Sequence, residues 1–235
     1  MPMLGFDPLY LVFTVPALLL SLLAQGLVKS RFSKYSKVMA RSRMTGAEAA
    51  RNLLLRAGIA DVRVERVNGF LSDHYDPSSN TLRLSEAVYG SQSLSALGVA
   101  CHEAGHALQK ANNYGPMALR SMLVLPASLG SRFSDIVIIL GAMMQSPTLI
   151  NVGLIMFGAA VLFTLVTLPV EWDASARAKK ALIASGILLP QEQSHAASVL
   201  NAAFMTYLAS AVSAILTMLY YLIRLGVIGG GKRNR

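Results

Sequence analysis

Residues 8–28, PLYLVFTVPALLLSLLAQGLV, form an uncharged apolar run that is followed at once by KSRFSKYSKVMARSR at residues 29–43. About 20 apolar residues are enough for a helix to cross a bilayer. Lys and Arg follow this run and do not precede it, which is the reverse of their order in a cleavable signal peptide. The pattern therefore predicts an uncleaved transmembrane anchor with its basic flank in the cytoplasm.

The composition also indicates a membrane protein. The chain has 235 residues, of which 54% are hydrophobic and 14% charged, whereas a soluble domain carries about a quarter charged residues. The net charge is +9, and 12 of the 21 basic residues lie in 29–116. This distribution follows the positive-inside rule, so we expect a lipid bilayer as partner and no nucleic acid. The single cysteine, Cys101, excludes an intramolecular disulfide.

Three more segments are apolar enough to cross a bilayer: 122–144, 149–170 and 202–223. The first contains Arg132 and Asp135, which we expect to pair on one helical face, because their spacing is i,i+3. An amphipathic helix lying on the membrane is the alternative for this segment.

The soluble stretch between the first two apolar runs predicts a small α+β region. Thr45 and Glu48 form a capping box that opens a helix through AARNLLLRA, and Gly58 can end it. DVRVERV predicts a short strand, HYDPSSN a turn and TLRLS a second strand. Another helix is expected at 93–111.

The expected fold is a mainly α membrane protein with about four transmembrane helices and a small cytoplasmic α+β, zincin-like region. The expected parts follow the chain: a membrane anchor at 1–28, the cytoplasmic catalytic region at 29–116, a transmembrane hairpin at 117–170, a cytoplasmic helix at 171–201, and a last transmembrane helix with a basic tail at 202–235.

The 93–111 helix carries CHEAGHAL at residues 101–108. His102 and His106 are one helical turn apart, so both imidazoles can reach one zinc ion. Glu103 can then reach a water molecule as general base, which is the H-E-x-x-H arrangement of metallopeptidases. Ala104 and Gly105 are small, which lets another segment pass close to this helix. A polar helical turn without metal is the alternative, but burying three titratable groups without a partner is costly.

A catalytic zinc site needs a third protein ligand and one open position. The candidates are His74, His195 and the carboxylates. Glu171 is favoured because it follows the third apolar segment, where Pro169 can open a new helix at the membrane surface. The alternative for Glu171 is an ion pair with Arg177 or Lys180.

A shared ion would constrain the membrane topology. His106 and Glu171 must then lie on the same side of the membrane, so an even number of crossings separates them. Segment 149–170 is a clear span, and 122–144 must therefore cross as well, with QSPT at the outer turn.

Several blocks of the chain resemble the bacterial membrane-bound neutral zinc metallopeptidases of the YugP type. They are DHYDP, LRLSEAVY, LGVACHEAGHALQ, TLPVEWDASARA and YYLI, in family order and spacing. The resemblance implies a zinc-dependent peptidase of the bacterial cytoplasmic membrane with its site facing the cytoplasm. It implies His102, His106 and Glu171 as zinc ligands and Glu103 as the base.

The chain also resembles, more remotely, the membrane gluzincins, whose third ligand is a glutamate on a later helix. Those enzymes often carry an aspartate four residues after this glutamate. Here that position is Ser175, and the nearby acid is Asp173.

The expected reaction is hydrolysis of peptide bonds in proteins or peptides, with membrane proteins among the substrates. Tyr207 and His195 are candidates for an oxyanion donor, and His74 and Asp173 for residues that hold the ligands from behind. TLRLS at 81–85 could act as an edge strand that pairs with an extended substrate, and the alternative is an ordinary strand of the sheet. The alternatives are a non-catalytic zinc-binding membrane scaffold and an intramembrane protease of the site-2 type, which would need the motif inside a spanning segment.

Overall fold

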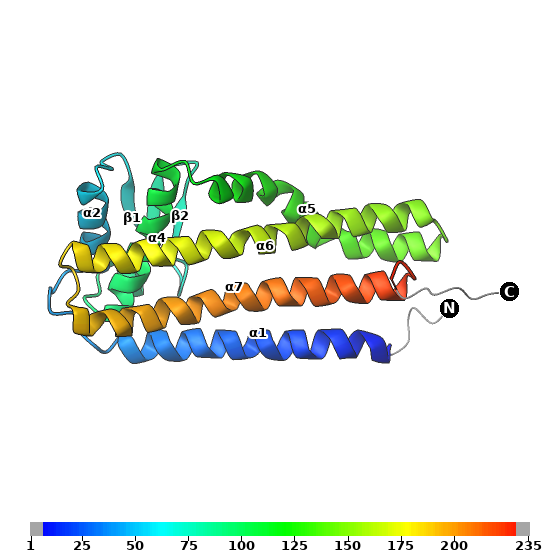
Figure 1. Cartoon of the computed structure of the whole chain (residues 1–235), viewed down its shortest axis with the longest axis horizontal. Coiled ribbons are helices and arrows are strands. Elements are labelled where there is room, and N and C mark those ends of the chain that lie inside the picture. Colours follow the sequence, from blue (N-terminus) through cyan, green and yellow to red (C-terminus); the bar gives the residue numbers. More distant parts are fainter. Residues whose placement is uncertain (1–6, 229–235) are drawn as a thin grey trace. The chain divides into compact units, whose positions relative to one another are not determined.

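The computed structural model describes residues 7–228, which are mainly helical with one small sheet (Figure 1). The helices are α1 Pro8–Tyr35, α2 Gly46–Arg56, α3 Glu86–Tyr89, α4 Leu94–Ala111, α5 Gly115–Met143, α6 Pro147–Ala184 and α7 Pro190–Arg224. The strands are β1 Arg63–Val67, β2 His74–Asp76 and β3 Thr81–Ser85.

The chain divides into two compact units, each built from several stretches of sequence. We call the first the helical unit; its described residues are 7–23, 119–168 and 207–228. We call the second the mixed unit; it comprises 24–118 and 169–206.

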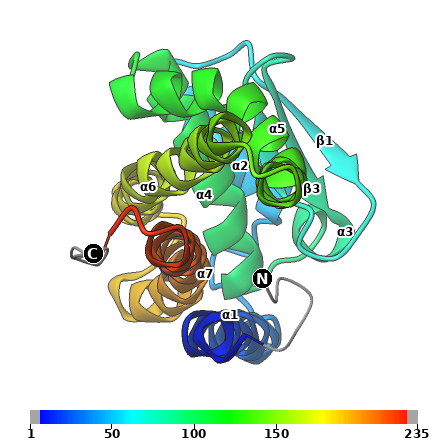
Figure 2. The ribbon, with the colours of Figure 1, turned by 90° about the vertical axis from the view of Figure 1, so that its right-hand side faces the viewer.

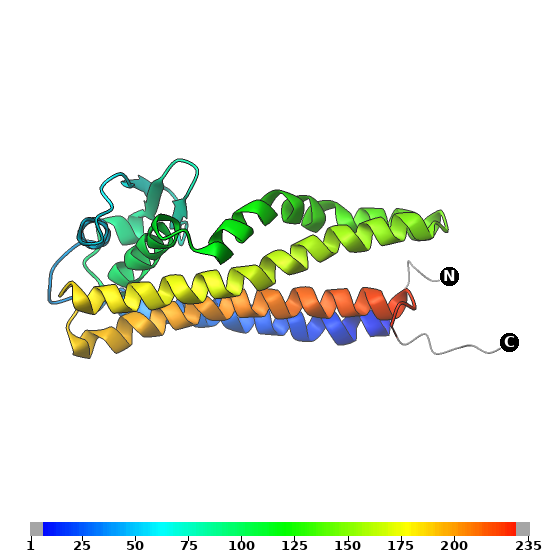
Figure 3. The same cartoon turned by 45° about the horizontal axis from the view of Figure 1, so that its top comes forward.

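The helical unit contains the apolar parts of α1, α5, α6 and α7. All four helices are long and apolar enough to cross a membrane, and they contain the four apolar runs predicted as spans. The α5–α6 hairpin is closely packed (Figure 3). A side chain at Gly130 of α5 would collide with the backbone carbonyl of Met156 on α6. On another side of the unit, the hydroxyls of Ser21 on α1 and Ser213 on α7 are 3.3 Å apart.

The expected pairing of Arg132 with Asp135 is wrong. Asp135 instead accepts a hydrogen bond of 2.7 Å from the Tyr221 hydroxyl of α7. Arg132 is exposed and has no hydrogen-bonding or ionic partner among residues 7–228. The i,i+3 spacing permits a pair within one helix, but a hydroxyl on a neighbouring helix competes successfully for the carboxylate.

The expectation that Pro169 opens a new helix is also wrong, because α6 continues through Pro169 to Ala184. Proline removes one backbone donor and strains the preceding turn. The apolar run before it and ASARAKKALIA after it both favour helix, however, and together they override this single interruption. Glu171 therefore lies on the same helix as the third predicted span.

The sheet of the mixed unit has the order β1-β3-β2, with β1 parallel and β2 antiparallel to β3. Figure 2 shows β1 and β3 side by side. The stretch TLRLS is therefore the central strand, so of its two alternatives the ordinary sheet strand is correct and the edge strand is not. HYD, expected within a turn, pairs with TLRLS as β2. Leu82 and Leu84 of β3 are fully buried, which is why this strand occupies the centre.

The two predicted helices of the mixed unit are confirmed. In α2, Thr45 and Glu48 form the capping box, and Gly58 adopts a positive φ of 73° just after the helix. In α4, the Ser93 hydroxyl accepts a hydrogen bond from the Ala96 N–H at the helix start. Almost all of α4 is buried against α2, α3 and the sheet. Helix α4, which carries the CHEAGHAL motif, is therefore part of the core of the mixed unit.

Candidate metal centre

Three buried side chains converge in the mixed unit: His102 and His106 from α4 and Glu171 from α6. One Oε2 atom of Glu171 lies 3.2 Å from His102 Nε2 and 3.5 Å from His106 Nε2. Glu171 is only 2% exposed. The structure thus brings together the three residues that the sequence nominates as ligands.

The absence of a side chain at Gly105 allows α4 and α6 to approach each other. A β-carbon at this position would lie 2.6 Å from the Ala174 carbonyl oxygen, closer than real β-carbon contacts allow. His106 is the next residue on α4, and Glu171 lies one helical turn before Ala174 on α6. The predicted close passage beside Gly105 is confirmed, and it sets the distance between His106 and Glu171, the candidate ligands.

Gln109 orients the ring of His106. Its Nε2 donates to the Val170 carbonyl oxygen at 2.7 Å and to Asp173 Oδ2 at 2.8 Å. Both of these partners are acceptors only, so the amide nitrogen must face them and Oε1 must face His106 Nδ1 at 2.9 Å. Nδ1 of His106 therefore carries a proton, and Nε2, the other ring nitrogen, is directed toward Glu171.

Ser175 occupies the corresponding position behind His102. Its hydroxyl oxygen is 3.1 Å from His102 Nδ1, and His102 Nε2 points at Glu171. Ser175 lies four residues after Glu171 on α6. A neutral hydroxyl thus lies behind His102, and the Nε2 atoms of both histidines face the same carboxylate.

Asp173 reaches the centre only through Gln109. Its Oδ2 atom also accepts from Arg177 Nε at 2.5 Å, and the Arg177 guanidinium lies over the Tyr114 ring. The expected support by Asp173 is therefore indirect. Arg177, considered above as a partner for Glu171, pairs with Asp173 instead.

Glu103 is held by the sheet. Its Oε2 atom accepts a hydrogen bond of 3.0 Å from the Tyr75 backbone N–H in β2. Tyr75 pairs with Leu82 on its other side, so this N–H is available at the outer edge of the strand. The outer edge of β2 thereby orients the carboxylate of Glu103, the residue after His102.

Burial and the neighbouring carboxylates act in opposite directions on the pKa of His106. Burial alone would lower the pKa of this imidazole. The hydrogen bond to Glu171 and the negative charges of Glu171 and Glu103 outweigh burial and raise the pKa of His106 above its ordinary value. A metal ion at Nε2 would therefore compete with protonation of this imidazole.

The sequence did not single out Gln109 or Tyr75. Gln109 is three residues after His106 and so on the same face of α4, a spacing that could have indicated a partner. Tyr75 could not be found this way, because its contact with Glu103 is made by the backbone.

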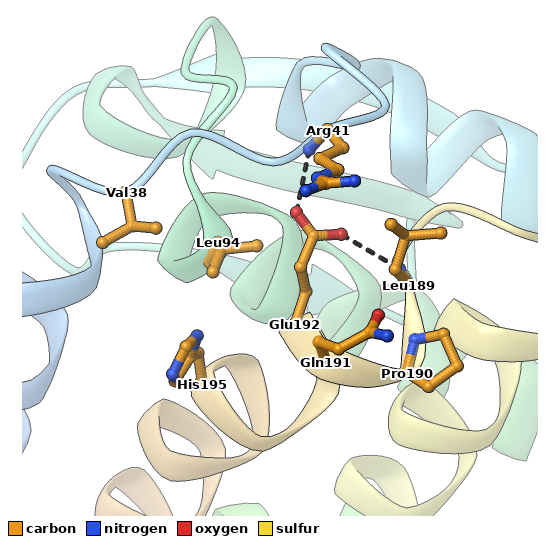
Figure 4. A pocket seen from close by; sticks show the side chains of 8 residues that line it. All are labelled: Val38, Arg41, Leu94, Leu189, Pro190, Gln191, Glu192 and His195. Carbon is orange, nitrogen blue, oxygen red and sulfur yellow. Dashed lines mark hydrogen bonds between the residues drawn. The ribbon is translucent and has the colours of Figure 1, made fainter.

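His195 and His74, two of the other candidates, make their contacts with residues other than the three candidate ligands. The His195 ring stacks on Tyr35 with centroids 5.0 Å apart and lines a separate cleft of about 590 Å³. Figure 4 shows this cleft, in which Glu192 accepts backbone hydrogen bonds from Arg41 and Leu189. His74 is exposed and its Nδ1 atom lies 2.8 Å from the Ser72 carbonyl oxygen.

Tyr207, the remaining candidate, belongs to the helical unit, whereas the centre lies in the mixed unit. Its role as an oxyanion donor stays a prediction.

The three ligands fit a zinc ion. Bonds of about 2.0–2.1 Å in tetrahedral geometry place neighbouring ligand atoms roughly 3.3 Å apart. The distances from Glu171 Oε2 to His102 Nε2 and His106 Nε2, 3.2 and 3.5 Å, bracket this value. Two imidazoles and one carboxylate also form the donor set of catalytic zinc sites, in which one position stays open.

Comparison with known proteins agrees with this chemistry. Residues 10–226 match the sequence model of a family described as "Putative neutral zinc metallopeptidase". The chain is 44% identical over 215 residues to "Putative membrane protease YugP" of Bacillus subtilis (strain 168), which covers 92% of this chain and 96% of that protein. No solved structure matches the chain. The chain therefore belongs to this family of zinc metallopeptidases.

Proposed function

We propose that the protein is a membrane-anchored, zinc-dependent endopeptidase in which His102, His106 and Glu171 hold the metal and Glu103 is the general base. The convergence of two Nε2 atoms on one Glu171 oxygen carries this proposal. Membership of a zinc metallopeptidase family supports the reaction class.

The zinc ion, when bound, supplies Lewis acidity that polarises the scissile carbonyl and makes a water molecule acidic near neutral pH. Glu103 takes the proton from this water and delivers it to the leaving amine. The Tyr75 N–H holds Glu103 Oε2, which leaves Oε1 to receive the proton. Gln109 and Ser175 keep both Nε2 atoms directed at the metal position.

We place the site on the cytoplasmic side of a bacterial cytoplasmic membrane. The basic stretch 29–43 follows the first span directly, which supports a cytoplasmic mixed unit. Residues 24–118 and 169–206 belong to this one unit, so an even number of crossings, α5 and the apolar part of α6, separates them. A site next to spanning helices suits proteins or peptides close to the membrane.

Two other functions were considered. A zinc-binding scaffold without catalysis would be expected to have four protein ligands, often cysteines, whereas the only cysteine is buried Cys101. An intramembrane protease needs its motif inside a span. The motif helix α4 is not among the four helices of the described chain that are long and apolar enough to cross a membrane.

The decisive experiment compares purified Glu103→Gln with the wild type and with Glu86→Gln, an acid of the exposed helix α3. We expect Glu103→Gln to bind one zinc per chain and to lose peptide hydrolysis by at least about a hundredfold, because general-base catalysis contributes roughly 10²–10⁴-fold. Glu86→Gln should match the wild type, whose activity should be abolished by a chelator. Retained hydrolysis in Glu103→Gln would refute the base assignment, and a zinc-loaded but inactive wild type would favour the scaffold.

A further inference from the structure

The exposed charge of Arg132 lies within an apolar helix and is not explained by the candidate metal centre. At a rise of 1.5 Å per residue, Arg132 is roughly 15 Å from the start of the apolar stretch 122–144. This is the middle of a hydrocarbon core of about 30 Å. An arginine so deep cannot bring its guanidinium to the membrane surface, and such residues almost always face protein or water.

Within the described part of the chain, no acid pairs with Arg132. Among residues 7–228 it makes no ion pair or hydrogen bond, and residues 1–6 and 229–235 contain no Asp or Glu. The nearest acid along the helix, Asp135, has its Oδ1 atom bonded to Tyr221 and is also exposed. Its Oδ2 atom makes no hydrogen bond within the described chain.

Arg132 and Asp135 belong to a stripe of residues spaced alternately by three and four, as in the contact line of a left-handed helix pair. We call this stripe the α5 seam; it consists of Leu125, Ser128, Arg132, Asp135, Ile139 and Ala142. Leu125 and Ile139 are 67% and 50% exposed. Another face of α5 buries Ala127, Ser134 and Ile138. The seam is therefore an unpaired face with small residues that permit close approach.

We infer that the α5 seam binds the same seam of a second copy of this chain, with Arg132 of each copy paired to Asp135 of the other. Two copies in one membrane share their orientation, so the twofold axis lies along the membrane normal and the two α5 helices run parallel. Arg132 and Asp135 then differ in height by about 4.5 Å, which a long arginine side chain can span. The seam carries one charge of each sign, so it is complementary to itself.

Cysteine cross-linking of the full-length protein in membranes tests this inference. Cys101 is fully buried and burial raises its thiol pKa to about 12, so an introduced cysteine is the one that reacts. Ile139→Cys lies on the seam, and the neighbouring Leu140→Cys, with exposures of 50% and 48%, is a matched control off the seam. We expect Ile139→Cys to give a disulfide-linked species of twice the 25.1 kDa chain mass, and Leu140→Cys to give little.

Adding Arg132→Leu to Ile139→Cys should reduce this dimer about tenfold, because each copy loses its interhelical pair. This change places an apolar side chain in an apolar span, so the fold should persist, as circular dichroism will check. Exchange of the two charges in the variant Arg132→Asp with Asp135→Arg should restore the dimer. Equal yields from Ile139→Cys and Leu140→Cys, or an unchanged yield with Arg132→Leu, would overturn the inference. Cross-links only to other polypeptides would show that the seam serves a different transmembrane partner.

Discussion

The polar groups of the candidate metal centre and those of α5 differ in how completely the chain itself satisfies them. In the centre, both imidazoles are held at Nδ1 by Gln109 and Ser175, and their Nε2 atoms face Glu171. In α5, Asp135 has one partner, Tyr221, and Arg132 has none among residues 7–228.

This difference separates two kinds of site. In the candidate metal centre, both histidine rings are oriented by partners at Nδ1, and their Nε2 atoms face one point. Such a network is prepared for a metal ion that fits at that point. A charge that remains unpaired in an apolar span indicates a surface that something else must cover. The network of the metal centre depends on contacts within one chain, whereas the charged surface of α5 requires a partner. The following predictions test how complete the first network is.

The largest effect should come from Glu171→Gln, which removes the carboxylate that both histidines face. We expect zinc affinity to fall by more than about a hundredfold, since even residues behind the ligands contribute about 10–100-fold. Trp172→Phe is the control, because Trp172 is the next residue on α6, is 59% exposed and contacts Phe204. Competition with a fluorescent chelator gives both affinities. Unchanged affinity in Glu171→Gln would remove Glu171 from the ligand set.

Gly105→Ala should disturb the spacing between α4 and α6. The added β-carbon would meet the Ala174 carbonyl oxygen at 2.6 Å, and overpacking of this kind costs roughly 1–3 kcal/mol. We expect a lower melting temperature together with weaker zinc binding.

The matched control is Gly98→Ala on the same helix, where the nearest atoms to the new β-carbon are at an ordinary 3.6 Å. This variant should be as stable as the wild type or more so, because alanine is the better helix former by about 1 kcal/mol. Equal losses in both variants would show that helix propensity or general packing, and not the approach of α6, explains the result.

Gln109→Leu should weaken zinc binding by about tenfold or more while preserving the three ligands. Leucine fills a similar volume but cannot accept the His106 Nδ1–H, and it leaves the Val170 carbonyl oxygen without the Gln109 donor. Gln191→Leu, an exposed position on α7, serves as the control. Zinc affinity measured by calorimetry should separate the two variants; identical values would mean that Gln109 does not orient His106.

The smallest effect should be the pH dependence of zinc binding in the wild type. The pKa of His106 is raised by Glu171, so the metal-free imidazole keeps its proton to a higher pH than usual. Zinc must displace this proton, so affinity should fall as pH drops through the raised pKa, by up to about tenfold per pH unit for one proton, and level off above it. Affinity that is constant between about pH 8 and about pH 6 would contradict the coupling.

Local patterns in the sequence accounted for much of the fold. Apolar runs indicated the four long helices, and the Thr45–Glu48 capping box marked the start of α2. Two outcomes depended on the surroundings of a local signal. Pro169 is accommodated within α6, against the prediction, and TLRLS is the central strand, where the sequence leaves an edge strand and an ordinary sheet strand both open. In both cases the neighbouring residues, and not the signal itself, decided the outcome.

The sequence alone determined the chemistry available to this protein: two histidines one turn apart, a glutamate beside the first, and apolar runs long enough to cross a membrane. These features depend on helical spacing and on hydrophobicity, which are local properties. Only the tertiary structure decided that Glu171 meets both histidines, that Gln109 and Ser175 orient the rings, that the Tyr75 N–H holds Glu103, and that Arg132 has no partner among residues 7–228. Such contacts join residues through the packing of separate elements, and no local spacing along the chain encodes that packing.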